Sequence, residues 1–351
     1  MRALVTGGSG YFGSLLSRQL VDAGHEVVNL DISAPEDPVP GVTFVDGDIR
    51  DEAAVLTACA GQDVVFHNVA QVPLANDPGL FESVNSFGTQ NLLRAALRTG
   101  VGKVVYTSSS AVFGVPDHNP VTETTPPRPV EAYGQAKLDG ERLCAAAVSQ
   151  GLDVSIIRPR TILGHGRLGI FGLLFDWVAD GVDIFVFDGG TNRYQFVHAA
   201  DLASAAILAG ARPGPETYNI GAGDFGTMGQ MMQALCDHAG TGAGVRSISS
   251  RAAAPVMKAL SRMGLAPFAD YHWLMYAREL WFDTTKAQTQ LGWSPQYSND
   301  QMICESYDWF LSHRGDLSTH GVSHHTSTVK QGALALGKQV IERLPGDPPR
   351  R

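Results

Sequence analysis

Short hydrophobic runs alternate with amphipathic stretches through the first half of this sequence. The apolar runs cover residues 2–6, 26–30, 42–45, 63–70, 103–108 and 153–158. Runs of this length are typical of strands buried on both faces of a sheet. The intervening stretches have helical spacing, as in residues 52–59, 80–99 and 131–150. Strands that alternate with helices predict an α/β fold with a doubly wound parallel sheet.

The pattern loosens beyond Pro159, where the residues predict a smaller lobe. We expect helices near residues 171–179, 201–209 and 227–239, and strands near 194–198 and 217–220. The predicted organisation is a cofactor-binding domain over 1–160, a substrate-binding lobe over 161–314 interleaved with the last sheet strands, and a tail over 315–351. The stretch 255–281, rich in Met, Leu and aromatic residues, either covers a hydrophobic substrate or belongs to the core. In the tail, residues 333–341 predict an apolar helix that docks on the protein, a partner or a membrane surface.

The net charge and the cysteines of the sequence limit which binding partners and which cellular compartment we expect. The formal net charge is −9 and no long basic run occurs, which argues against a nucleic-acid partner. The four cysteines are scattered, so we expect neither a disulfide framework nor a cysteine-rich metal site. With no recognisable signal peptide or membrane-spanning run, we expect a cytoplasmic protein.

A glycine-rich turn lies between the first predicted strand and the first helix. Gly7, Gly10 and Gly13 have the spacing G-x-x-G-x-x-G. Small residues let the backbone turn tightly and approach a pyrophosphate, and the helix that follows presents N–H groups and its positive dipole end. A turn without a ligand is the alternative. The strand before it, the helix after it and an acid at the end of the next strand favour a dinucleotide.

That acid is Asp31, and it selects between the two nicotinamide cofactors. A carboxylate here would hold a ribose 2′-hydroxyl and repel a 2′-phosphate, so we predict NAD. Asp48 follows the third strand, where it could accept from the adenine amino group, cap the next helix, or do both. The predicted cofactor contacts are Gly7, Gly10, Tyr11, Phe12, Gly13, Asp31, Ile32, Asp48, Ile49, Val69, Ala70, Tyr133, Lys137 and Pro159.

A candidate catalytic pair lies on the helix after the fifth strand. Tyr133 and Lys137 are four residues apart and therefore share one helix face. An ammonium beside a phenol favours the phenolate, which can remove a proton from a substrate hydroxyl as hydride leaves for a nicotinamide. Ser109, at the end of the fifth strand, would hydrogen-bond the same oxygen. Lys137 would also hold the nicotinamide ribose.

Taken together, these segments resemble the extended short-chain dehydrogenase/reductases of the NAD-dependent epimerase/dehydratase family. The matching pieces are TGGSGYFG, Asp31, GDIRD, SSSAVFG, YGQAK, RPRTILG, QFVHAADLA, YNIGAG and LGWSP, which span nearly the whole chain. The resemblance implies a Rossmann-type fold and a catalytic set of Ser109, Tyr133 and Lys137. It also implies small-molecule chemistry on a nucleotide-activated sugar, and we expect a homodimer.

At several positions this sequence departs from the family pattern, and these departures limit which reactions we expect. Dehydratases of the family carry an Asp-Glu pair directly after the catalytic Ser/Thr, whereas this chain has Ser110 and Ala111, which cannot do acid–base chemistry. A usual phosphate-binding Asn is Thr161 here, and a usual phosphate-binding Arg is Tyr194.

The candidate substrate contacts are Ser110, Arg160, Thr161, Arg193 and Arg278, with surface charge as the alternative role of Arg160 and Arg278. We predict a nucleotide-sugar 4-epimerase. The alternative is a dehydrogenase of an apolar secondary alcohol, as in the steroid-dehydrogenase-like branch. A non-catalytic NAD-sensing protein is disfavoured because Tyr133 and Lys137 are both present.

Overall fold

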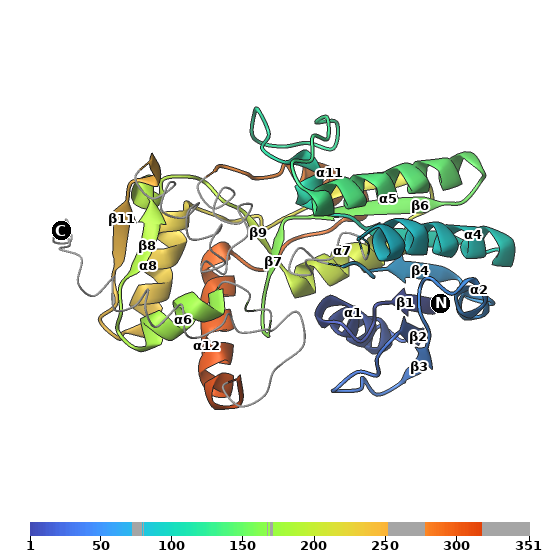
Figure 1. The fold of residues 1–351 in the computed structure, drawn as a ribbon, viewed down its shortest axis with the longest axis horizontal. Helices are drawn as coiled ribbons and strands as arrows, with labels where there is room; N and C mark the ends of the chain where they lie inside the picture. The colour runs from blue at the N-terminus through green and yellow to red at the C-terminus, as the bar shows by residue number, and fades with distance from the viewer. Residues whose placement is uncertain (72–78, 80, 167, 169–170, 252–277, 318–351) are drawn as a thin grey trace. The chain divides into compact units, whose positions relative to one another are not determined.

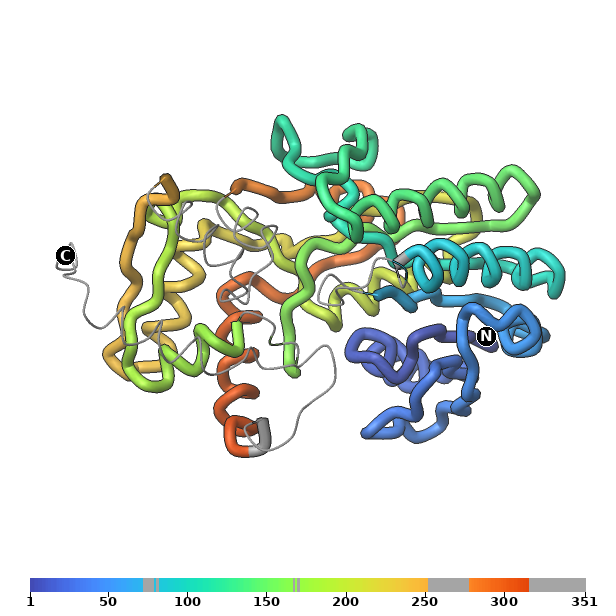
Figure 2. Tube along the Cα trace, in the orientation of Figure 1, coloured from blue at the N-terminus to red at the C-terminus, as the bar shows by residue number. Residues whose placement is uncertain are grey.

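The computed structural model describes residues 1–71, 79, 81–166, 168, 171–251 and 278–317. The chain forms two units. The first contains Met1–Ile162, Val197–Gly223 and Trp281–Gln296, and the second contains Leu163–Phe196, Asp224–Leu280 and Tyr297–Arg351. Figure 2 shows that the first unit combines segments from the blue beginning of the trace to its orange part. Most of the apolar stretch 255–281 and the whole predicted tail helix 333–341 lie outside the described residues.

The first unit is built on one parallel sheet of seven strands in the order β10-β6-β5-β4-β1-β2-β3. The strands are β1 (Arg2–Thr6), β2 (Glu26–Asp31), β3 (Val42–Asp46), β4 (Val64–His67), β5 (Lys103–Thr107), β6 (Val154–Pro159) and β10 (Glu216–Ile220). Every neighbouring pair is parallel, and β1 lies between β2 and β4. The strand order reverses beside β1, which is where open α/β sheets bind their ligands. The predicted doubly wound fold is confirmed.

Helices cover both faces of this sheet because successive strand residues point to opposite sides. Ala3 and Val5 pack with Leu16 of α1 (Tyr11–Asp22) and Ala205 of α7 (Ala199–Ala211). Leu4 instead joins the cluster formed by α2 (Glu52–Cys59), α4 (Thr89–Thr99) and α5 (Ala132–Ser149). The short helix α11 (Thr285–Leu291) packs beside α7. Figure 1 shows α4 and α5 side by side.

The stretch 80–99 differs from the single helix that its periodicity predicts. A π-helical segment, η1 (Phe81–Gly88), leads into α4, which ends at Gly100 in the left-handed conformation with φ 73°. The predicted stop at Gly100 is thus confirmed. A short 3₁₀ turn, η2 (Ser110–Phe113), begins three residues after the end of β5.

The second unit is organised around aromatic packing. It contains α6 (Phe171–Ala179), β8 (Ile184–Phe187), η3 (Asp188–Gly190), α8 (Met228–Ala239), β11 (Val245–Ile248) and α12 (Asn299–Leu317), with β8 and β11 parallel. The ring of Phe175 lies 6.1 Å from that of Phe171 and 5.7 Å from that of Tyr307. The strands β7 (Thr161–Leu163) and β9 (Phe196–His198) lie where the chain passes between the units. Within the described ranges, no helix has both the length and the apolar character needed to cross a bilayer.

Candidate active site

The glycine turn connects β1 to α1 at the carboxyl edge of the sheet. Gly7 has a φ of +73°, and its N–H donates to the Leu30 carbonyl at 2.9 Å. A Cβ placed on Gly13 would lie 2.1 Å from the Gly7 carbonyl oxygen, so the start of α1 packs directly against the turn. Gly10, the residue before α1, has no side chain that could cap the helix. This arrangement suits an anion at the helix N-terminus.

Asp31 is tied to the glycine turn by a backbone hydrogen bond. The Ser9 N–H donates to Asp31 Oδ2 at 3.0 Å, and Asn29 Nδ2 donates to Ser9 Oγ at 3.0 Å. The sequence interpretation missed Asn29, although it lies two residues before Asp31 and therefore on the same face of β2. The Phe12 side chain is buried in the core, so only its backbone could face a cofactor, whereas Ile32 is 65% exposed.

Asp48 does not cap α2, which corrects one of its two predicted roles. The carboxylate accepts from Nε and Nη2 of Arg50 at 2.9 and 2.5 Å, and this partner lowers the pKa of Asp48. The cap is Asp51, which accepts from the Ala53 N–H at 2.9 Å. The prediction that Asp48 contacts adenine stays a prediction. Ile49, beside it, is buried.

His67, the last residue of β4, belongs to a buried hydrogen-bond chain. Its Nδ1 lies 2.7 Å from Thr6 Oγ1, and its Nε2 lies 3.0 Å from Thr89 Oγ1. Burial first, and the charge of Lys137 second, lower the pKa of His67 to about 3. His67 is therefore a neutral link between the ends of β1, β4 and α4.

The segment after His67 is held against the glycine turn. A Cβ on Gly7 would lie 3.1 Å from the Val69 backbone nitrogen, which brings Val69 beside that turn. Ala70 follows Val69, and the Asn85 side chain hydrogen-bonds both backbone groups of the next residue, Gln71. Asn85 Oδ1 accepts from the Gln71 N–H at 2.7 Å, and Asn85 Nδ2 donates to the Gln71 carbonyl at 3.2 Å.

Ser109, Lys137 and the helix turn that carries Tyr133 lie at the carboxyl end of β5. Ser109 Oγ accepts from the Ala111 N–H at 3.1 Å, which leaves its hydroxyl hydrogen for another acceptor. A Cβ on Gly134, the neighbour of Tyr133, would lie 2.4 Å from the Ala111 carbonyl oxygen. The first turn of α5 therefore packs against the turn that carries Ser109.

Lys137 anchors α5 to the end of β5. Its Nζ donates to the Thr107 carbonyl at 2.7 Å and lies 5.1 Å from the centre of the Tyr106 ring. The side chain is 3% exposed, and this burial lowers the pKa of Lys137 to about 8. The negative charge of Glu141 acts in the opposite direction. The ammonium form therefore predominates at neutral pH, as stabilising a Tyr133 phenolate requires.

Ser110 and Arg160 form a buried contact next to Ser109. Arg160 Nη1 donates to Ser110 Oγ at 2.9 Å, and the guanidinium carbon lies 5.6 Å from the centre of the Phe282 ring. Arg160 is 2% exposed, so its alternative interpretation as surface charge is wrong. It follows Pro159, the buried last residue of β6.

The other predicted substrate residues are distributed between the two units. Thr161 is half-buried and belongs to the first unit. In the second unit, the Arg193 guanidinium lies 4.9 Å from the centre of the Phe225 ring, and Arg278 is exposed. Tyr194 is buried against Phe196, with ring centres 4.9 Å apart. Their roles toward a substrate stay predictions.

The sequence interpretation missed a buried ion pair behind the catalytic residues. Arg158 Nη2 lies 2.6 Å from Glu141 Oε2, and Ser108 Oγ donates to Glu141 Oε1 at 2.6 Å. One sequence signal was available, because Glu141 lies eight residues after Tyr133 and so on the same helix face. Its partners on β5 and β6 could be found only in the folded chain.

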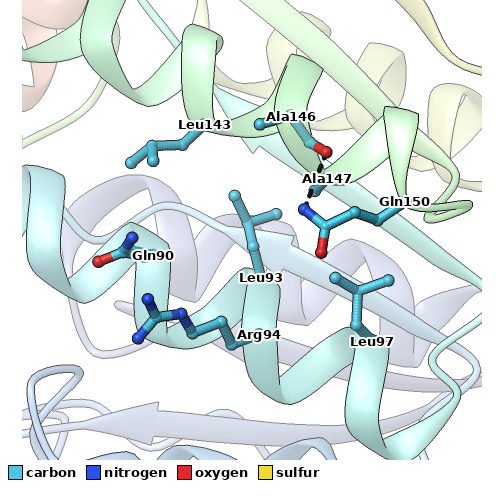
Figure 3. Close-up of a pocket in the computed structure, with 8 residues that line it drawn as sticks. All are labelled: Gln90, Leu93, Arg94, Leu97, Leu143, Ala146, Ala147 and Gln150. Carbon is cyan, nitrogen blue, oxygen red and sulfur yellow. Dashed lines mark hydrogen bonds between the residues drawn. The ribbon is translucent and has the colours of Figure 1, made fainter.

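A separate cavity of about 230 Å³ lies between α4 and α5. Figure 3 shows Leu93 and Leu97 of α4 facing Leu143 and Ala147 of α5. Its lining contains Gln90, Gln150 and Arg94 but neither an acid nor a tyrosine, so it offers no general base. We therefore place the active site at the carboxyl edge of the sheet.

Comparison with known proteins identifies the family. Residues 3–221 match the model of the NAD dependent epimerase/dehydratase family. The chain belongs to this family. Its members include epimerases, dehydratases and dehydrogenases, and this protein is an NAD-dependent enzyme of the extended short-chain dehydrogenase/reductases.

The relatives differ in the reactions that their names describe. The uncharacterized protein y4nG of Sinorhizobium fredii is 51% identical over 98% of this chain and 87% of its own. A UDP-glucose 4-epimerase of Mycolicibacterium smegmatis is 29% identical over 88% of this chain and 98% of its own. A 3-beta-hydroxysteroid dehydrogenase of Mycolicibacterium neoaurum is also 29% identical, over 88% of this chain and 91% of its own.

Among solved structures, a DesIV double mutant with NAD and DAU bound is similar to this chain. That protein is a dTDP-glucose 4,6-dehydratase from Streptomyces venezuelae. It is 29% identical, has a TM-score of 0.71, and the match covers 90% of this chain and 98% of that chain.

The residues of the first unit fit the NAD that the family uses. The close approach at Gly13 leaves a turn without side chains at the start of α1, where a pyrophosphate would be held. Asp31 offers a carboxylate for a ribose hydroxyl. Lys137 places an ammonium at the carboxyl end of β5.

Proposed function

We propose that this enzyme epimerises a nucleotide-activated sugar at C4 through a transient keto sugar. The observation that carries the proposal is the packing of the first turn of α5, which carries Tyr133, against the turn after Ser109, with Lys137 reaching the end of β5. The two residues after Ser109, Ser110 and Ala111, are not acidic. Oxidation and reduction at a carbinol need one positioned base. Dehydration would also need an acid to protonate the leaving hydroxyl, and neither Ser110 nor Ala111 can supply that proton.

In this mechanism, each residue has one task. Ser109 donates a hydrogen bond to the substrate hydroxyl oxygen, and Tyr133, as the phenolate, removes the hydroxyl proton. Lys137 stabilises that phenolate by its charge and binds the nicotinamide ribose. NAD, which the glycine turn, Asp31 and Lys137 would hold, would supply the hydride acceptor for C4 and the hydride donor for the reverse step. Tyr133 then gives the proton back to the oxygen on the reverse step, so an epimerase regenerates its cofactor in each cycle.

The substrate would be bound by residues next to this site. Ser110 follows Ser109 in the chain and accepts from Arg160, so these two are the proposed substrate contacts of the first unit. Arg193 and Arg278 stay predicted contacts of the nucleotide diphosphate. The homodimer, the cytoplasmic location and tail docking stay predictions from the sequence.

A second function is an NAD-dependent dehydrogenase of an apolar secondary alcohol. It is favoured by the replacement of the family's phosphate-binding Asn and Arg by Thr161 and the buried Tyr194, and by the similarity to a 3-beta-hydroxysteroid dehydrogenase. The same Ser109, Tyr133 and Lys137 would serve this reaction. It differs in redox balance, because NADH would accumulate.

One experiment separates the two functions. The enzyme is incubated with UDP-, dTDP-, GDP- and CDP-sugars, and both NADH absorbance and sugar configuration by NMR are followed. Inversion at C4 without net NADH supports the epimerase. NADH formation from steroid-like alcohols, without turnover of any sugar nucleotide, overturns it. Arg160→Ala and Arg278→Ala then test the phosphate contacts, because only a sugar-nucleotide enzyme should lose substrate affinity through them.

A further inference from the structure

A buried ion pair ties the helix of Tyr133 and Lys137 to strand β6. Arg158 donates to both oxygens of Glu141, from Nε at 2.8 Å and from Nη2 at 2.6 Å. Their side chains are 8% and 7% exposed. A two-point contact of this kind fixes the geometry of both groups. Because burying two charges is costly, such a pair is weak evidence for a role in stability alone.

The same carboxylate holds the backbone that presents Ser109. Ser108 Oγ donates to Glu141 Oε1 at 2.6 Å, and the Ser108 N–H donates to the Ile157 carbonyl at 2.8 Å. Ser108 therefore extends the pairing of β5 with β6 by one residue, directly before Ser109. A shift of Glu141 would move the segment from which Ser109 projects.

Arg158 extends the contact to the turn that follows Ser109. Its guanidinium carbon lies 5.0 Å from the centre of the ring of Phe113, the last residue of η2. Glu141 itself lies four residues after Lys137 and eight after Tyr133, so the three share one face of α5. The pair thus links α5, which carries Tyr133 and Lys137, to Ser108 before Ser109 and to the turn η2 after it.

The charges around the Lys137 ammonium give Glu141 a second role. On α5, Glu141 and Cys144 face this ammonium, and burial raises the pKa of the Cys144 thiol so far that it stays neutral. On β5, burial likewise keeps the Tyr106 phenol neutral, and on β4 the lowered pKa of His67 keeps that ring neutral. Of these groups, Glu141 is the one that carries a negative charge, and although it is paired with Arg158, that charge favours the ammonium form of Lys137.

We propose that Glu141, held by Arg158 and Ser108, is a positioning residue that keeps Tyr133 and Lys137 aligned with Ser109 and keeps Lys137 charged. The proposal rests on the proposed roles of Tyr133 and Lys137. It assigns no contact between Glu141 and the substrate or the cofactor.

The test compares Glu141→Gln with Glu141→Asp. NADH affinity is measured by fluorescence titration between pH 6 and about 9.5, because Lys137 is the proposed ribose contact and loses its proton near pH 8. Glu141→Gln removes the charge, so we expect the fall in affinity to move to lower pH by roughly half a unit to one unit. Glu141→Asp keeps the charge, so its midpoint should stay close to that of the unmodified enzyme. An unchanged midpoint in Glu141→Gln overturns the electrostatic role.

Turnover of the sugar nucleotide identified by the panel tests the alignment. At pH 6.5, where Lys137 stays charged, we expect Glu141→Gln to lower kcat by about 10- to 100-fold with little change in KM. A kcat equal to that of the unmodified enzyme contradicts the alignment role. Asp153→Asn is the matched control, because it breaks the Lys103–Asp153 ion pair at the other end of the same two strands and should leave both readouts unchanged. A shift of either readout in Asp153→Asn would also count against the proposal.

Two further variants complete the test of the Glu141 proposal. If Glu141→Gln does not fold by circular dichroism, Ser108→Ala keeps the ion pair and removes only the hydrogen bond beside Ser109. It should lower kcat several-fold without moving the NADH midpoint, and an unchanged kcat would overturn the proposal. Lys137→Met reports on the proposed function itself. If Lys137→Met binds NADH normally, the role of Lys137 fails and the role of Glu141 falls with it.

Discussion

Two buried lysines lie at opposite ends of strand β5, and the difference between them separates a structural charge from a chemical one. Lys103, the first residue of β5, pairs with Asp153 at 2.6 Å and also donates to the Gly214 carbonyl. Lys137 reaches the last residue of the same strand, where its Nζ donates to the neutral Thr107 carbonyl. Burial lowers the pKa of both lysines, but Asp153 counteracts it directly at Lys103.

The environment of each lysine therefore decides what its charge can do. The field of Lys103 is neutralised by the carboxylate that it touches. The charge of Lys137 is only partly balanced, by Glu141, so it can act on a neighbouring phenol and on a bound ribose. At the carboxyl edge, Glu141 and Arg158 are fully paired with each other, whereas Lys137 donates to a neutral carbonyl, which is why we assign the proposed chemistry to Lys137.

The largest expected effect is that of Tyr133→Phe. Removing the base should lower turnover by about 10²–10⁴-fold, because the substrate proton then has no positioned acceptor. NAD binding should persist, since the ring and Lys137 remain. Steady-state kinetics and NADH fluorescence measure the two quantities. Near-normal turnover would show that another group is the base.

Lys137→Met should reduce both turnover and cofactor affinity. We expect a loss of about 100-fold in kcat and about tenfold in NAD affinity, because one ammonium serves the phenolate and the ribose. Isothermal titration gives the affinity and initial rates give kcat. A loss of only one of the two would separate roles that we assign to a single side chain.

Asp31→Ala tests the proposed cofactor contact at the carboxyl edge of the sheet. Removing the carboxylate should lower NAD affinity and raise NADP affinity, so that their ratio changes by roughly tenfold or more. Parallel titrations with NAD and NADP measure this ratio. The variant also removes the acceptor of the Ser9 N–H, but the Gly7 N–H still bonds the Leu30 carbonyl, so the glycine turn should persist. An unchanged ratio would mean that Asp31 only orients Ser9.

The neutral His67 should make the protein acid-sensitive. Its pKa is about 3 in the folded chain against an ordinary 6.5, so between these values the unfolded chain binds a proton that the folded chain does not. Stability is therefore retained above pH 6.5 and is lost as the pH falls, with a slope that approaches about 1.4 kcal/mol per pH unit. Denaturant unfolding from pH 7 to 4.5 measures the slope. His67→Gln should flatten it, and an equal slope in that variant would place the sensitivity elsewhere.

The smallest effect on activity is expected for Lys103→Met. The change removes the ammonium that pairs with the partly exposed Asp153 and leaves this carboxylate only the Gly214 N–H, which should cost about 1–3 kcal/mol of unfolding free energy. Turnover and the pH dependence of NADH affinity should match those of the unmodified enzyme. If Lys103→Met moved that pH dependence, the two ends of β5 would be electrostatically coupled and the contrast between the two lysines would break down.

The sequence alone determined the alternating strands and helices, the glycine turn, the terminal acid of β2 and the spacing of Tyr133 and Lys137. These features are local, because a period of 2 or 3.6 residues and a short turn depend on near neighbours. The parallel sheet and the use of NAD followed from them and were confirmed. The stop of α4 at Gly100 was confirmed for the same reason.

Only the tertiary structure decided which distant side chains meet. It showed that Asp48 pairs with Arg50 while Asp51 caps α2, a difference of three residues that sequence pattern cannot resolve because either acid suits a cap. It also placed Glu141 between Arg158 and Ser108, and buried Arg160 against Ser110. These contacts depend on β5 and β6 being neighbours and on α5 packing across them. Long-range pairing of this kind leaves no periodic signal along the chain.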